Sequence, residues 1–104
     1  IFMITVTVAG MEQSLEGLSE SWLHEQIRWR QKAGEPVCVQ VVVNTSDINV
    51  GVSSGACPVG PGGSRRPSSK EQQVLDLWSH FGLGHGDLNS GKLVAFLQRL
   101  RSLV

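Results

Sequence analysis

The sequence has only two cysteines, no long apolar run and no surplus of charge, and each shortage argues against a class of protein. Two cysteines, Cys38 and Cys57, are too few for a disulfide-rich scaffold, so we expect a reducing compartment and a cytoplasmic location. No stretch approaches the roughly 18 apolar residues that span a bilayer, and the apolar start lacks the basic flank of a signal peptide. The sequence therefore predicts neither a membrane span nor a signal peptide.

The chain also has no surplus of positive or negative charge. Nine Lys plus Arg balance nine Asp plus Glu, and charged residues make up 17% of the chain. Proteins dedicated to nucleic acid usually carry a basic surplus that neutralises phosphates, so we expect neither nucleic acid nor a membrane surface as partner. The chain has 104 residues and is 40% apolar, which predicts one folded domain over residues 1–104. The strand and helix patterns described next predict that this domain is α+β.

The first half, residues 1–53, has the pattern of a β-α-β-β unit. Apolar side chains alternate mostly with polar or small ones over residues 2–8, 37–44 and 48–53, and β-branched types dominate. Between the first two segments, Ser19 is a suitable N-cap for an apolar stripe that predicts a helix over residues 19–32. We expect a three-stranded sheet. Its first two strands run parallel through a right-handed crossover, and its third strand returns antiparallel at an edge.

The second half begins with a loop and ends with a helical hairpin. Three of the four prolines fall in residues 54–68, which show no periodicity and therefore predict a flexible Gly/Pro-rich loop. Over residues 69–104, overlapping capping boxes at Ser68 and Ser69 predict a helix start, and a second helix begins at Asn89 or Ser90. The apolar stripes of the two helices together form too small a core to be stable alone, so we expect both to pack on the sheet or on a partner.

The Gly-rich loop is the one segment that suggests a ligand. Free backbone N–H groups beside Arg65 and Arg66 would complement an anion, and nearby cations would lower the pKa of the Cys57 thiol. The loop lacks both phosphate-binding glycine motifs, however, and its prolines remove donors. A small enzyme or phosphate-binding domain that uses Cys57, Arg65 and Arg66 is therefore the alternative hypothesis. Cys38, within a valine-rich strand, is predicted to be a small core residue.

Other reactive arrangements are not indicated. The histidines have no close cysteine pair of the kind that zinc sites use, and no calcium-loop or Ser/His/Asp pattern is present. We therefore expect no metal, no cofactor and no catalytic residue, and we consider an enzyme less expected than a binding protein.

Three tryptophans, Trp22, Trp29 and Trp78, are half of the aromatic residues. Core packing accounts for indoles on amphipathic helices, but any that stays exposed would mark a partner surface, because tryptophan is enriched at binding hot spots. The sequence thus favours a non-catalytic protein-interaction or adaptor module whose partner is another protein. The exposed side of the helical hairpin is one candidate surface, and the third strand, as a sheet edge, would allow strand addition or self-association.

Overall fold

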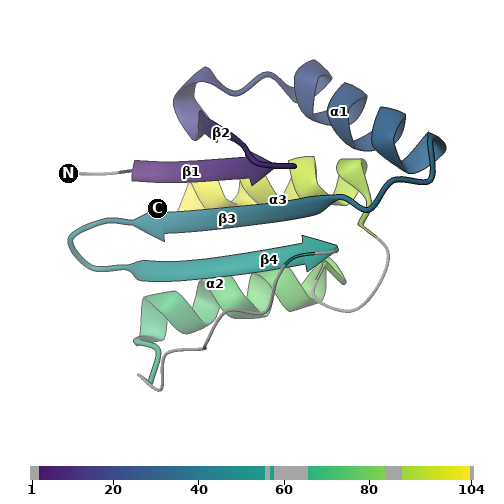
Figure 1. The fold of residues 1–104 in the computed structure, drawn as a ribbon. Helices are drawn as coiled ribbons and strands as arrows, with labels where there is room; N and C mark the ends of the chain where they lie inside the picture. Colours follow the sequence, from purple (N-terminus) through teal and green to yellow (C-terminus); the bar gives the residue numbers. More distant parts are fainter. Residues whose placement is uncertain (1–2, 56, 58–65, 84–87, 104) are drawn as a thin grey trace.

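The computed structural model describes residues 3–55, 57, 66–83 and 88–103. The described strands form one antiparallel sheet with the order β2-β1-β3-β4, and α2 and α3 lie behind it (Figure 1). This confirms the predicted α+β class. The elements are β1 (Met3–Val8), β2 (Met11–Ser14), a 3-10 turn η1 (Leu15–Gly17), α1 (Glu20–Lys32), β3 (Cys38–Asn44), β4 (Asn49–Gly55), α2 (Ser69–His80) and α3 (Ser90–Leu103).

The sheet has four strands rather than the predicted three, because a hairpin precedes α1. Ala9 and Gly10 both have positive φ, 51° and 85°, as the tight turn of a two-residue hairpin requires. The chain then returns along β1, with Met11 opposite Val8. This short strand contains no β-branched residue, and three of its four side chains are exposed, so periodicity did not reveal it.

The same hairpin makes the predicted parallel pairing wrong. The chain runs back along β1 as far as Ser14, opposite Thr5. Helix α1 then runs in the direction of β1 (Figure 1). The following strand β3 therefore starts where β1 ends and pairs with it antiparallel. Without β2, a helix leaving the end of β1 would have delivered the chain to its start, which is the parallel arrangement.

The two faces of the sheet differ in character. The inner face is apolar apart from the buried Ser54 and faces the helices, while alternate residues on the outer face are half-buried or exposed. In the described part of the chain no helix lies on that outer face (Figure 1). An antiparallel sheet tolerates water on one side when that side is polar. The buried inner residues include Ile4, Val6, Val8, Val39, Val41, Val43 and Val52, and the outer ones include Thr5, Thr7, Gln40, Val42 and Ser53.

The helices begin and end close to the predicted positions. Ser19 caps α1 by accepting a hydrogen bond from the Trp22 N–H, and Ser68 caps α2 in a complete capping box with Glu71. Apolar residues of α1, α2 and α3 join the sheet in one hydrophobic core. The predicted helical hairpin packed on the sheet is therefore confirmed. Among the described residues, no helix is both long enough and apolar enough to cross a bilayer.

The predicted Gly/Pro-rich loop over residues 54–68 is described only at its ends. Gly55 still belongs to β4, which extends two residues further than the alternation predicted. Residues 58–65 lie outside the described residues, so the flexibility of this loop stays a prediction.

Candidate functional site

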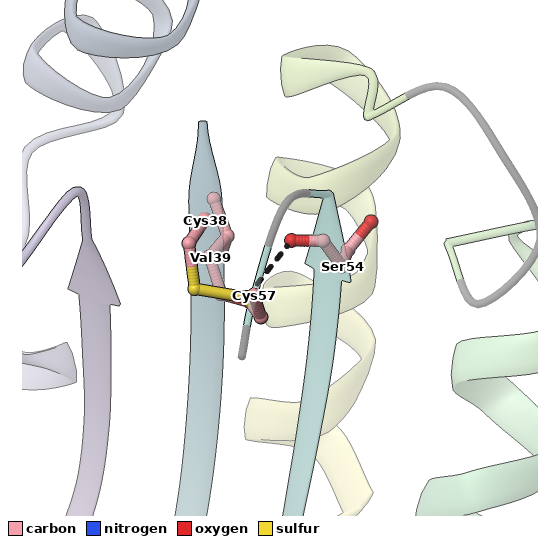
Figure 2. Close-up of a disulfide and its surroundings, with 4 residues drawn as sticks. All are labelled: Cys38, Val39, Ser54 and Cys57. Carbon is pink, nitrogen blue, oxygen red and sulfur yellow. Dashed lines mark hydrogen bonds between the residues drawn. A yellow bond between two sulfur atoms is a disulfide. The ribbon is translucent and has the colours of Figure 1, made fainter. Parts of the chain in front are cut away.

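Cys38 and Cys57 are joined in a disulfide (Figure 2). Cys38 opens β3 on its outer face, and its Cα lies 4.7 Å from that of Cys57. The prediction that Cys38 is a small core residue is therefore wrong: its side chain is half-buried and covalently paired. The alternation correctly predicts a strand here, but it cannot show that the chain later brings Cys57 back to the same end of that strand. Disulfides persist mainly in oxidising compartments, so this bond argues against the reducing compartment expected from the cysteine count. The cytoplasmic location stays a prediction.

A left-handed glycine directs the chain toward this bond. Gly55 has φ +83°, and a Cβ there would overlap the carbonyl oxygen of Val37, so only glycine fits. Beyond it, the Cys57 Sγ lies 3.3 Å from the Ser54 carbonyl oxygen and 3.6 Å from that of Val39. A disulfide sulfur has no hydrogen to donate, so these are close contacts in the oxidised chain. They become possible hydrogen bonds only when Cys57 is a thiol.

The predicted anion site is incomplete in the described chain. Cys57 is bonded to Cys38 and has no free thiol in this oxidised structure. Arg66 is exposed just before α2, and Arg65 lies outside the described residues. An anion site built from Cys57, Arg65 and Arg66 therefore stays a prediction.

The three tryptophans occupy three different environments. Trp78 is 5% exposed and packs edge-to-face on Phe96, with ring centroids 5.0 Å apart. Trp22 is partly buried against the core. Trp29, in contrast, is 60% exposed. Only one of the three predicted surface residues therefore presents a large apolar ring to solvent.

Trp29 lies among basic side chains on the last turns of α1. Arg28 and Lys32 are exposed, and the guanidinium carbon of Arg30 lies 5.3 Å from the centroid of the indole. The other partner of Arg30 is Glu35, at 3.5 Å. A cation near an exposed aromatic ring contributes about 0.5–1 kcal/mol. We call Arg28, Trp29, Arg30 and Lys32 the Trp29 surface.

The helix that carries this surface is anchored to the rest of the chain. Leu23 and Ile27 are fully buried in the core. The Nδ1 of His24 lies 2.8 Å from the Oγ of Ser90, and the Gln31 side chain donates a hydrogen bond of 2.6 Å to the Leu88 carbonyl. Both contacts join α1 to the start of α3, across more than fifty residues of sequence. Sequence reasoning missed them because no local signal reports such distant neighbours.

The His24–Ser90 pair links α1 to the first residue of α3. In a catalytic triad a carboxylate holds one imidazole nitrogen while the other faces the serine. Among the described residues no carboxylate hydrogen bonds to His24, and Ser90 is buried as the first residue of α3. In the same described set, no three His, Cys, Asp or Glu side chains gather as metal ligands would.

Among the hollows in the described part of the chain, two open between helices. One, beside η1 and lined mainly by leucines of η1, α1 and α3, has a volume of about 10 Å³, which is room for one water molecule. The other is an open groove of about 330 Å³ between α2 and α3, lined by Gln73, Leu77, Arg99, Ser102 and Leu103. Neither contains a histidine or a cysteine, so no reactive group is focused there.

Comparison with protein-family models, with curated proteins and with solved structures gives no match to this chain.

Proposed function

We propose that this chain is a non-catalytic protein-interaction module that binds a partner protein through the Trp29 surface. The observation that carries the proposal is the 60% exposure of Trp29, while Trp22 and Trp78 pack in or against the core. Tryptophan is enriched among residues whose truncation weakens binding most, because its large ring excludes water over a wide area when a partner covers it. Such a side chain left in solvent is a natural anchor for a partner.

The setting of Trp29 also suits binding. It lies on a regular helix that is fixed by two fully buried side chains, Leu23 and Ile27. Arg30 restrains the ring from one side at 5.3 Å. A partner would therefore meet a side chain that is already placed, and less conformational entropy is lost on binding.

Two other surfaces support binding less well. The outer sheet face carries mostly threonine, glutamine, asparagine and serine, and its exposed Val42 stands alone among them. Strand β4 is an edge, as predicted for the third strand, but the N–H of its first residue, Asn49, already donates to Glu71 of α2. Strand addition or self-association at β4 therefore stays a prediction, which the hydrodynamic mass of the purified chain would test.

The experiment is a selection of random peptides against the oxidised full chain, followed by affinity measurements on variants. Trp29→Ala should weaken the selected peptides by about 30-fold, the usual effect of a tryptophan hot spot. Alanine favours a helix, so the variant should keep its fold. The matched control is Val42→Ala, which removes an exposed apolar side chain from the opposite sheet face and should change affinity by less than about threefold. Peptides that bind both variants as well as the wild type would refute the proposal.

A further inference from the structure

We infer that the partner segment recognised at the Trp29 surface is acidic, with a carboxylate next to an apolar side chain. This inference rests on the proposed function and specifies the chemistry of its ligand. It follows from the charges that surround the exposed indole on α1.

Within the described part of the chain, the cations of this surface are not fully balanced by neighbouring carboxylates. Arg28 and Lys32 are one turn apart on α1, both are exposed, and neither forms an ion pair with any described residue. Like charges at this spacing repel each other. Arg30 is paired with Glu35, and among the described residues of α1 the exposed carboxylate one turn before Arg28 is Glu25. Three cations thus meet two carboxylates in a chain whose net charge is zero.

The helix end explains part of this arrangement. Basic residues in the last turn of α1 interact favourably with the negative end of the helix dipole, so Arg30 and Lys32 have a structural role. The helix dipole does not explain why the indole of Trp29, next to these cations, is exposed. An acidic ligand accounts for both features, because it relieves the repulsion and covers the ring at the same time.

Helical spacing places the three side chains so that one ligand can reach them together. Lys32 is three residues from Trp29 and four from Arg28, and residues at these spacings are neighbours on a helix surface. A carboxylate held by Arg28 and Lys32 would therefore bring a neighbouring apolar side chain onto the indole. Arginine suits this role because its planar guanidinium can bind both carboxylate oxygens.

A carboxylate-bearing protein segment fits better than nucleic acid. Single-stranded nucleic acid binds in grooves that track several phosphates with cations and stack successive bases on aromatic rings. This surface offers one exposed tryptophan, and the chain has no basic surplus. A short acidic segment needs only the two cations and the one ring.

The test uses the random-peptide selection on the oxidised full chain, repeated with charge variants. Peptides that require Trp29 should be enriched in Asp and Glu, and replacing those residues by Asn and Gln should weaken binding by about tenfold or more. Arg28→Glu/Lys32→Glu should abolish the acidic preference, and Arg28→Gln/Lys32→Gln, which adds no negative charge, should weaken acidic peptides in the same direction. The matched control, Lys92→Glu/Arg99→Glu, makes the same change of net charge on α3 instead of α1 and should leave affinity within about threefold.

The outcomes separate the two proposals. Peptides that require Trp29 but carry no excess of acidic residues would overturn this inference and leave the proposed function standing. Peptides that ignore Trp29 would overturn the proposed function. A single-stranded oligothymidylate, or a vesicle of anionic lipid, that displaces the acidic peptides and itself requires Arg28, Trp29 and Lys32 would overturn the assignment to a protein segment.

Discussion

The carboxylate of Glu71, on α2, accepts the backbone N–H of Asn49 at the start of strand β4, at 2.7 Å. Its other oxygen accepts the N–H of Ser68 at 2.8 Å, which closes the capping box of α2. Glu71 is 1% exposed although it is an acid, and these hydrogen bonds explain how it is accommodated. One side chain thus both starts a helix and fixes that helix to the edge strand.

Replacing Glu71 should therefore destabilise the fold. In Glu71→Gln one carboxylate oxygen becomes an NH₂ group, which cannot accept a hydrogen bond, so one backbone N–H loses its partner. We expect the free energy of unfolding, measured by urea denaturation, to fall by about 1–3 kcal/mol. Asp76→Asn on the exposed face of the same helix makes the same chemical change and should cost less than about 0.5 kcal/mol. Equal stabilities of the two variants would contradict this role for Glu71.

The disulfide should contribute to stability by restricting the unfolded chain. Cys38 and Cys57 are 19 residues apart in sequence, a separation for which loop-closure entropy predicts about 3 kcal/mol. The double variant Cys38→Ser/Cys57→Ser should lose about 2–4 kcal/mol relative to the oxidised wild type in urea denaturation. Under a dithiol reductant most of this difference should disappear, because the wild type then lacks the bond as well. A difference that persists unchanged in reductant would assign the loss to the serines instead.

Alanine substitution of a buried and of an exposed tryptophan should have very different effects on stability. Trp78→Ala removes a buried ring that packs on Phe96 and should cost about 3–5 kcal/mol. Trp29→Ala should cost no more than about 1 kcal/mol, because it removes mainly the cation–π contact with Arg30. Thermal and urea unfolding of both variants measure the contrast. A large loss on Trp29→Ala would mean that the ring stabilises the fold and is not held ready for a partner.

Two glycines in β4 should respond differently to alanine. Gly55 has φ +83° and no room for a Cβ beside the Val37 carbonyl, so Gly55→Ala should cost about 1–3 kcal/mol. Gly51 lacks a positive φ, and its nearest neighbour beyond the adjacent residues is the Val42 side chain at 3.9 Å. Gly51→Ala should therefore change stability by less than about 1 kcal/mol in either direction. If the two substitutions cost the same in urea denaturation, the turn at Gly55 is not the constraint described above.

The parts of the fold that follow from local chemistry could be predicted from the sequence. Ser19 and Ser68 indicate where two helices begin, because each caps the helix that follows it. The alternation of Val39, Val41 and Val43 predicts one buried face of the sheet. Both signals act over only a few residues of sequence. The missed features depend on residues that meet only in the fold. Nothing near Cys38 reports Cys57, and nothing in residues 11–14 indicates a strand until β1 is there to pair with it.

The sequence narrowed the candidate surface to three tryptophans but could not show which of them is exposed. Helical spacing places Trp22 and Trp29 on nearly the same flank of α1, so periodicity alone gives them the same environment. Packing of α1 against the core distinguishes them, leaving Trp29 exposed and Trp22 partly covered.

The most direct measurement of the role of Trp29 is ¹⁹F NMR of the chain labelled with 5-fluorotryptophan, which gives a resonance for each of its three tryptophans. Each resonance is assigned by single substitution to phenylalanine. On titration with an acidic peptide from the selection, the Trp29 resonance should shift and saturate with the binding curve, while that of the buried Trp78 should stay in place. A peptide that reaches saturation without moving the Trp29 resonance would show that the partner binds elsewhere.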